Sequence, residues 1–125
     1  MRLLLDTHVL IWSLGDPGQL PAATASAIRS GDNEVLVSIV SPWEIAIKKS
    51  VGKLRAPGDL EAQLSEKGFD LLPITLRHTG ALEVLPFHHR DPFDRTLIAQ
   101  ARTEGLTVVT HDSAFDSYDV ETLWS

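Results

Sequence analysis

Short apolar runs alternate along the chain with longer amphipathic stretches. The runs are rich in Leu, Val and Ile and mostly lack alternation with polar residues, which is typical of strands buried on both faces of a parallel sheet. The predicted strands are Arg2–Leu5, Val35–Val40, Phe69–Ile74, Leu106–Thr110 and Val120–Trp124.

Helices are predicted between these strands, because several of the stretches open with Pro and stop before Gly. They are Thr7–Leu14, Pro21–Ser30, Pro42–Val51, Asp59–Lys67, Leu76–Leu85 after a Thr75 cap, and Pro92–Glu104. Lys53–Gly58 breaks the pattern and is predicted to be a mobile or partner-facing loop. The alternation predicts an α/β fold: a three-layer α/β/α sandwich around a central, mainly parallel sheet with right-handed crossovers.

The composition is that of one globular domain over residues 1–125, with 43% hydrophobic and 22% charged residues. The chain has no cysteine, which excludes disulfides and thiolate metal sites and fits the expected cytoplasmic location. No apolar run approaches the about 20 residues that span a bilayer. Asp6 and His8 interrupt the apolar start, so no signal peptide and no membrane partner are expected.

The formal net charge of the chain is −6. Proteins that bind nucleic acid through bulk electrostatics are usually basic, so a large non-specific binding surface is not expected. A nuclease is not excluded, because an acidic metal site adds negative charge of its own.

Four acids fall where the predicted strands end or the next helices begin. Asp6 ends the first strand, Asp112 follows the fourth, and Glu44 and Asp94 lie near the starts of two helices. In open α/β sheets, ligand sites form at the carboxyl ends of the strands. If the sheet is parallel, the four acids therefore share one end of the domain.

Glu44 and Asp94 occur in matching contexts, Ser-Pro-Trp-Glu and Asp-Pro-Phe-Asp. Both segments are assigned as N-cap, N1, N2 and N3 of a helix. Asp91 is therefore expected to be an N-cap, and a fifth site acid is the alternative. Each of the four acids, taken alone, is explained equally well as a helix cap that favours the helix dipole or as a residue of a functional site.

The acids taken together favour a cation site. Two carboxylates about 4 Å apart repel by roughly 4 kcal/mol at an effective dielectric near 20. Because whole domains are stable by only about 5–15 kcal/mol, such a cluster needs a proton or a cation. Oxygen ligands without cysteine point to Mg²⁺ or Mn²⁺.

Four ordered motifs resemble those of PIN-domain ribonucleases of the VapC type, the toxins of type II toxin–antitoxin pairs. They are Leu3–His8, Ser41–Ile45, Arg90–Arg95 with Leu97–Ala101, and Val109–Asp112 with Phe115. Since they run from Leu3 to Phe115, the resemblance spans nearly the whole chain.

The resemblance implies a function and a set of site residues. It implies Mg²⁺- or Mn²⁺-dependent endonucleolytic cleavage of RNA that leaves a 5′ phosphate and a 3′ hydroxyl, a homodimer, and a cognate antitoxin that blocks the site. Asp6, Glu44, Asp94 and Asp112 match the acidic quartet of the family, as catalytic residues and metal ligands, with Glu44 holding a water or a second metal. Thr110 matches a small hydroxyl residue that supports the site.

Several basic residues lie near the motifs. Lys48 and Arg95 follow quartet acids on their helices and are either solvated ion-pair partners or contacts to a substrate phosphate, as Arg90 also is. The adjacent His88 and His89 are not expected to bind one ion, and a loop or substrate contact fits them better. His8 is a candidate RNA contact, and Asp116 is expected on the surface.

The aromatic residues allow two interpretations. Trp12, Trp43, Trp124 and Phe93 are expected in the core or an interface, and stacking of an RNA base is the alternative. Trp12 and Val9 share the first helix and together predict an apolar face for a dimer or an antitoxin.

Two other kinds of function are the alternatives. The first is another acidic-pocket enzyme or phosphoacceptor on an α/β sheet. A haloacid-type phosphatase would carry Asp-x-Asp after the first strand, where this chain has His8 as the third residue. A phosphoacceptor receiver would carry an acidic pair before the first helix and a Lys after the last core strand, and neither is present. A non-catalytic module whose acids are caps is the second alternative, and loss of metal-dependent cleavage in Asp6→Asn and Asp94→Asn separates it from a nuclease.

Overall fold

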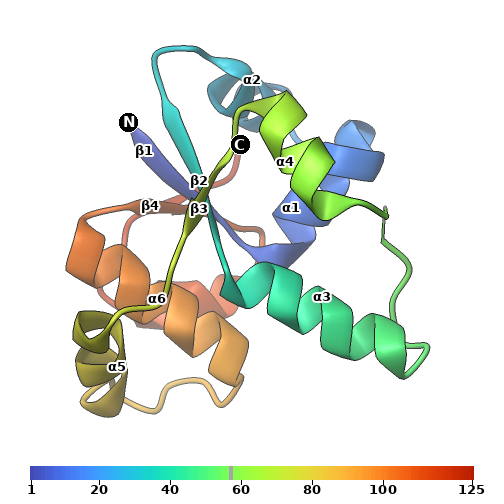
Figure 1. The fold of residues 1–125 in the computed structure, drawn as a ribbon. Coiled ribbons are helices and arrows are strands. Elements are labelled where there is room, and N and C mark those ends of the chain that lie inside the picture. Colours follow the sequence, from blue (N-terminus) through green and yellow to red (C-terminus); the bar gives the residue numbers. More distant parts are fainter. Residues whose placement is uncertain (57) are drawn as a thin grey trace.

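The computed structural model describes residues 1–56 and 58–125; Pro57, within the predicted loop Lys53–Gly58, lies outside the described residues. Five strands form one sheet in the order β3-β2-β1-β4-β5, and every neighbouring pair is parallel (Figure 1). The strands are β1 (Arg2–Leu5), β2 (Glu34–Ser38), β3 (Asp70–Leu72), β4 (Thr107–Val109) and β5 (Thr122–Leu123). The predicted parallel sheet is confirmed.

Helices separate the strands along the chain. The α-helices are α1 (Thr7–Gly15), α2 (Ala22–Arg29), α3 (Val40–Ser50), α4 (Leu60–Lys67), α5 (Leu76–Glu83) and α6 (Pro92–Glu104), and the 3-10 helices are η1 (Pro17–Gln19) and η2 (Ser113–Ser117). Among the described residues, no helix has the length and apolar character needed to cross a membrane.

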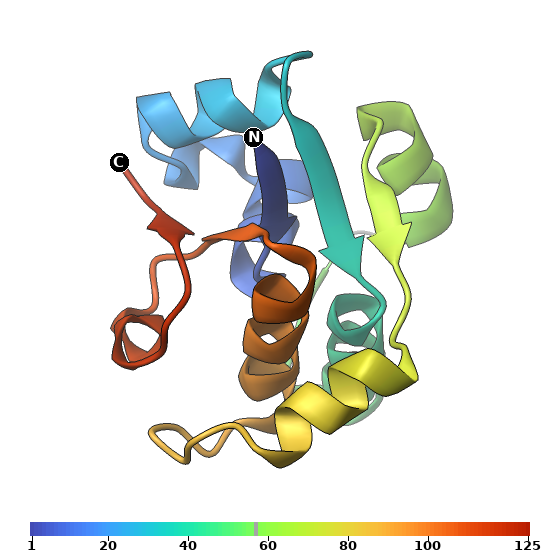
Figure 2. The same cartoon turned by 90° about the vertical axis from the view of Figure 1, so that its left-hand side faces the viewer.

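Alternate residues of β1 pack into two separate hydrophobic cores, one on each face of the sheet. The sheet is therefore the middle layer between two layers of helices. Leu3 and Leu5 pack with residues of α1, α2 and α4 on one face of the sheet. Leu4 packs on the other face with Leu97 and Ile98 of α6. In the view turned by 90°, helices lie on both sides of the strands (Figure 2). The predicted α/β/α sandwich is therefore confirmed.

The strand order reverses direction at β1, which lies between β2 and β4. Leu5 pairs with Val109 at the carboxyl ends of β1 and β4. Ligands of open parallel sheets bind outside the carboxyl ends at such a switch point. Asp6 directly follows β1, and Asp112 lies three residues after the end of β4.

One predicted boundary is wrong in a way that affects the site. The strand predicted over Val35–Val40 ends at Ser38, and α3 begins at Val40 rather than at Pro42. The Ser38 hydroxyl accepts the backbone N–H of Val40 at 3.1 Å. Because the first N–H groups of a helix have no intrahelical acceptor, Pro42 fits the third helical position without losing a hydrogen bond.

Candidate active site

Asp6 is held at the carboxyl end of β1 by hydrogen bonds to both oxygens. It is the N-cap of α1, where Oδ1 accepts the N–H of Val9 at 2.8 Å, and Oδ2 accepts the hydroxyl of Thr110. Burial raises the pKa of the Asp6 carboxyl and the charge of Asp112 raises it further, while the bonds from Thr110 and Val9 lower it. Asp6 is therefore a fixed, buried acid in a site that disfavours its charge.

Thr110 ties the ends of the two central strands together. Its hydroxyl donates to Asp6 and accepts the N–H of Asp112 at 3.0 Å. Asp112 caps η2 through Ala114 N–H at 2.9 Å, and its side chain is exposed. Thr110 therefore contacts both Asp6 and Asp112, and its role in the site stays a prediction.

Asp94 lies in the first turn of α6, and Asp91 is the N-cap that precedes it. The Asp91 carboxylate accepts the N–H groups of Phe93 at 2.8 Å and Asp94 at 3.1 Å, as predicted for a cap. Burial and the charges of Asp91 and Asp112, partly offset by the contact with His89, raise the pKa of Asp94 to about 6. Asp94 is thus an acid whose charge is left under-compensated at neutral pH.

Three residues place ligand atoms close enough to share one cation. Atoms of His89, Asp94 and Asp112 all lie within 4.8 Å of one another. His89 Nε2 is also 3.0 Å from Asp94 Oδ2. Carboxylate oxygens with one imidazole nitrogen suit Mn²⁺ or Mg²⁺, so the residues present fit a divalent ion.

His89 is the site residue that the sequence interpretation undervalued. The His89 ring contacts Asp94 from the irregular segment that precedes α6, and the backbone N–H of His89 donates to the Tyr118 hydroxyl at 2.9 Å. Its position five residues before Asp94, just ahead of a helix cap, was the available signal.

Glu44 lies apart from that set, and its charge is compensated. The Thr7 hydroxyl donates to Glu44 Oε1 at 2.7 Å and lies 3.0 Å from the Ser41 hydroxyl. Lys48 Nζ binds Glu44 Oε2 at 2.5 Å, which is the predicted ion pair one turn along the helix. Hydrogen bonding to Glu44 raises the pKa of Lys48, and the charges of Asp91 and Asp94 raise it further. Lys48 therefore faces both groups of acids.

The assignment of Ser41 to the N-cap and Glu44 to N3 is wrong. The helix starts at Val40, so Ser41 and Pro42 are already inside its first turn. Glu44 consequently lies beyond the first turn, on the face of α3 that meets Thr7 of α1.

Arg95 was expected to be a solvated ion-pair partner or a phosphate contact, but it is buried away from the acids of the site. Its side chain is buried, its guanidinium donates to the carbonyl oxygens of Pro86 at 2.7 Å and Leu85 at 3.1 Å, and it contacts the Tyr118 hydroxyl at 3.1 Å. The Phe87 ring covers the guanidinium at 3.9 Å. Both predicted roles, a solvated ion pair and a phosphate contact, are corrected: Arg95 fastens the segment that carries His89.

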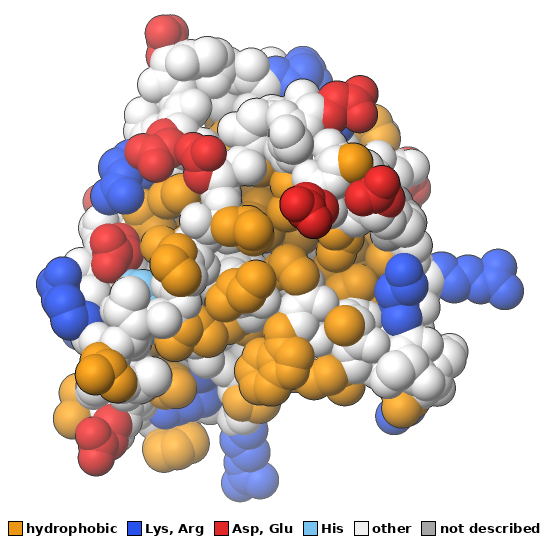
Figure 3. All heavy atoms as spheres, viewed as in Figure 1, with side chains coloured by type: hydrophobic (Ala, Val, Ile, Leu, Met, Phe, Trp, Pro, Cys, Tyr) orange, Lys and Arg blue, Asp and Glu red, His pale blue; other side chains and the backbone are white. Residues whose placement is uncertain are grey.

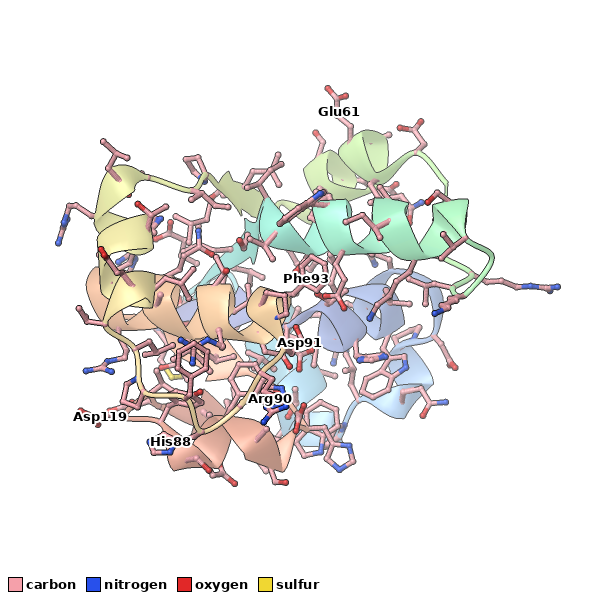
Figure 4. All side chains as sticks on the ribbon, turned by 90° about the horizontal axis from the view of Figure 1, so that it is seen from below. Glu61, His88, Arg90, Asp91, Phe93 and Asp119 are labelled. Atoms are coloured by element: carbon pink, nitrogen blue, oxygen red, sulfur yellow. The ribbon has the colours of Figure 1, made fainter. Side chains whose placement is uncertain are left out.

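The remaining candidates lie around the start of α6. Seen from below, Arg90 and His88 lie on the irregular segment that leads to Asp91 and Phe93 (Figure 4). His88 packs edge-on against Tyr118 at 5.1 Å, and Asp116 is exposed as expected.

The tryptophans divide between core and surface. Val9 is fully buried, so the apolar face expected from Val9 and Trp12 is not available to a partner. Trp12 and Trp124 are partly buried against the core of that layer. Trp43 is 57% exposed and meets Phe93 edge-on at 5.3 Å, which joins the starts of α3 and α6.

Comparison with protein families gives one match. The sequence profile of the family described as PIN domain matches residues 3–121, which is nearly the whole chain. No curated protein sequence matches this chain significantly.

Solved structures with this fold include several VapBC proteins, one of them described as a member of a family of toxin–antitoxin systems. VapBC2 of Rickettsia felis, bound to a DNA fragment from its promoter, is similar with a TM-score of 0.74 at 14% identity, over 100% of both chains. VapBC-1 of nontypeable Haemophilus influenzae has a TM-score of 0.69 at 16% identity, over 98% of this chain and 97% of that one. VapBC-5 of Mycobacterium tuberculosis has a TM-score of 0.61 at 22% identity, over 99% and 98%. At these identities the likeness shows a shared fold.

Proposed function

This chain belongs to the PIN domain family, and we propose that it is a metal-dependent endoribonuclease, the toxin of a VapBC-type toxin–antitoxin pair. The observation that carries the proposal is the convergence of acids from separate segments. Asp6 follows β1, Asp112 follows β4, and Asp94 lies in the first turn of α6; Asp94 and Asp112 are close enough to share an ion, and Asp6 and Asp112 line one hollow.

Asp6, Asp94 and Asp112 are the proposed holders of Mg²⁺ or Mn²⁺, with His89 beside them. A divalent ion bound there supplies Lewis-acid activation of water and balances charge on the phosphate. Thr110 fixes the orientation of Asp6, and His89 does the same for Asp94 through its 3.0 Å contact. Partners of this kind hold ligands in position and tune them.

Glu44 and Lys48 have a supporting role in this proposal. Glu44 holds the ammonium group of Lys48, which interacts with Asp91 and Asp94 and can contact an RNA phosphate. In the cleavage itself, water adds a hydroxyl to phosphorus, the bond to the 3′ oxygen breaks, and that oxygen takes a proton. The products are a 5′ phosphate and a 3′ hydroxyl.

Protein partners complete the proposal. VapBC-5 of Mycobacterium tuberculosis is a member of the VapBC family of toxin–antitoxin systems, and we expect a cognate antitoxin that blocks the acidic site of this chain in the cytoplasm. A second copy is the expected occupant of an apolar face at the β3 edge, where hydrophobic side chains gather over β3 and α3 (Figure 3). The partly exposed side chains there are Ile39, Trp43, Ile47, Leu71 and Ile74. Contiguous apolar surface of this kind marks interaction sites.

Cleavage of RNA by purified variants tests the nuclease. Asp6→Asn and Asp94→Asn are expected to lose Mg²⁺- or Mn²⁺-dependent cleavage while their circular dichroism stays native. Asp116→Asn removes an exposed acid on η2 outside the set and serves as the matched control. Wild-type cleavage rates in both site variants, or equal cleavage by the wild type in EDTA, would contradict the proposal.

Sedimentation and co-expression test the partners. Ile47→Glu is expected to turn a dimer into a monomer, because it places a charge in the apolar face. Co-expression with a small protein encoded directly upstream is expected to yield a complex that no longer cuts RNA. A wild type that sediments as a monomer rules out the dimer without affecting the nuclease assignment.

A further inference from the structure

A hollow next to the acidic site is lined by aromatic rings. It has a volume of ≈200 Å³ and is lined by Asp6, His8, Trp12, His111 and Asp112. Two of the five lining residues, Asp6 and Asp112, are thus acids of the candidate site. The other three are aromatic side chains that have no role in the proposed nuclease mechanism.

The aromatic walls belong to a continuous row of four rings. His8 and Trp12 lie one turn apart on α1, with ring centroids 5.8 Å apart. Trp12 meets Trp124, which follows β5, at 5.9 Å. His111, which follows β4, stacks on Trp124 at 5.0 Å with an interplanar angle of 15°.

The row of rings is packed against the core on one side and exposed to solvent on the other. Trp12 and Trp124 pack against the core cluster formed by α1, α2 and α4, which fixes the row in place. His8 and His111 are exposed. Among the described residues that line the hollow, the aromatic groups therefore form a preformed, solvent-accessible stacking surface.

Charge favours stacking over ionic attraction as the source of RNA affinity. The chain carries a net charge of −6, and none of the five lining residues is Lys or Arg. Stacking on aromatic side chains needs no basic surface and contributes about 1–3 kcal/mol per base. It requires an unstacked base, so it selects single-stranded segments of RNA.

We propose that this hollow, lined by His8, Trp12 and His111, is a nucleobase subsite that binds an unpaired base adjacent to the scissile phosphate. The inference rests on the proposed nuclease function, because the base is placed by the phosphate at the acidic set. Asp6 and Asp112 border both the hollow and that set, so the two occupants are neighbouring parts of one RNA strand.

Binding of short single-stranded RNA tests the subsite. The Asp94→Asn protein, which is expected to bind RNA without cleaving it, is titrated with oligonucleotides that carry one abasic nucleotide at successive positions, and Kd is read by fluorescence anisotropy. One position is expected to weaken binding about 5- to 150-fold, the range that corresponds to loss of one stacked base. RNA with a base at that position is expected to quench tryptophan emission, and the abasic RNA is not.

Variants of the hollow connect this effect to named rings. Adding His111→Ala or Trp12→Leu should remove the dependence on the base, whereas Trp12→Phe should keep most of it. Trp12 is partly buried, so exposed His111 provides the variant that leaves the core intact. Leu76→Ala, at an exposed position of α5 outside both the hollow and the acidic site, is the control and should bind as the parent does.

Three outcomes would overturn the inference. The first is that no abasic position changes Kd by more than twofold. The second is that the His111→Ala and Trp12→Leu proteins keep the full dependence on the base. The third is that these substitutions weaken only binding of the antitoxin. In the last case the hollow binds protein rather than RNA. Failure of the nuclease proposal looks different: wild-type protein with Mn²⁺ then cuts none of the oligonucleotides, whatever their affinities.

Discussion

The starts of α3 and α6 carry nearly the same local sequence, yet their acids have opposite surroundings. Glu44 of α3 is paired with Lys48 and bonded by Thr7. Asp94 of α6 faces Asp91 and Asp112, and its pKa is raised to about 6. Similar motifs thus yield one acid paired with Lys48 and one acid whose raised pKa reflects burial among other acids.

The difference arises from where each helix begins. In α6, Pro92 is the first helical residue and Asp94 is in the first turn, close to the cap Asp91. In α3, the helix has already begun at Val40, which turns Glu44 toward α1. A shift of two residues at a helix start therefore decides whether the acid joins the cluster.

The largest expected effect is on RNA cleavage by Asp94→Asn compared with Glu44→Gln. Loss of a ligand to a catalytic ion should lower kcat/KM by about 10²- to 10⁴-fold, since such ions contribute several kcal/mol. Glu44→Gln should lose only about 10- to 100-fold, as for a residue that acts through another. Steady-state kinetics on one RNA substrate measures both, and equal losses would remove the distinction between the two helix starts.

The second effect concerns the support of the α6 site. Arg95→Met should lower the free energy of unfolding by about 2–4 kcal/mol, because two carbonyl acceptors and the Tyr118 hydroxyl lose a buried donor. Arg102→Met changes an exposed arginine on the same helix and should change stability little. Urea denaturation measures both, and a neutral Arg95→Met would show that the segment carrying His89 is held by other contacts.

The third effect follows from the raised pKa of Asp94. Between about pH 4 and the folded pKa of about 6, the native state binds more protons than the unfolded chain, so wild-type stability falls as pH rises. Asp94→Asn lacks this loss and should be more stable than wild type by about 1–3 kcal/mol at pH 7.5 in EDTA. The two proteins should converge at pH 4. Thermal melts at both pH values measure this, and a less stable variant at pH 7.5 would mean that the charge of Asp94 is compensated.

The smallest effect is the coupling between Glu44 and Lys48. If Glu44 acts by holding the Lys48 ammonium, Glu44→Gln and Lys48→Met should not be additive, with a coupling of about 3- to 10-fold in kcat/KM. Lys49→Met, at an exposed neighbouring position, serves as the control. Additive losses would mean that the two side chains act separately.

Much of the fold followed from the apolar pattern. Buried strands such as β1 lack polar alternation because both faces of the sheet are covered, so the parallel α/β/α arrangement was predictable. Helix α6 was predicted with its observed bounds, because Asp91, Pro92 and Gly105 mark its ends clearly. The start of α3 was not, since proline fits several positions of a first turn.

The positions of candidate site residues were predictable from the sequence where they directly follow a strand or begin a helix. They were not predictable where contacts with residues distant in the sequence determine the position of a side chain. Asp6, Asp94 and Asp112 were proposed from their places after strands and in a helix start, and the structure brings Asp94 and Asp112 together. The burial of Arg95 depends on carbonyl groups of Leu85 and Pro86 and on Tyr118, which no local pattern reveals.

Binding of Mn²⁺ to three proteins at pH 7.5 tests the central claim most directly. Isothermal titration of wild type, Asp94→Asn and Glu44→Gln separates the acid that needs a cation from the acid that is already paired. Wild type and Glu44→Gln should bind Mn²⁺ with Kd values within about threefold of each other, and Asp94→Asn at least about tenfold more weakly. Unchanged binding by Asp94→Asn, or equal loss in both variants, would contradict the account.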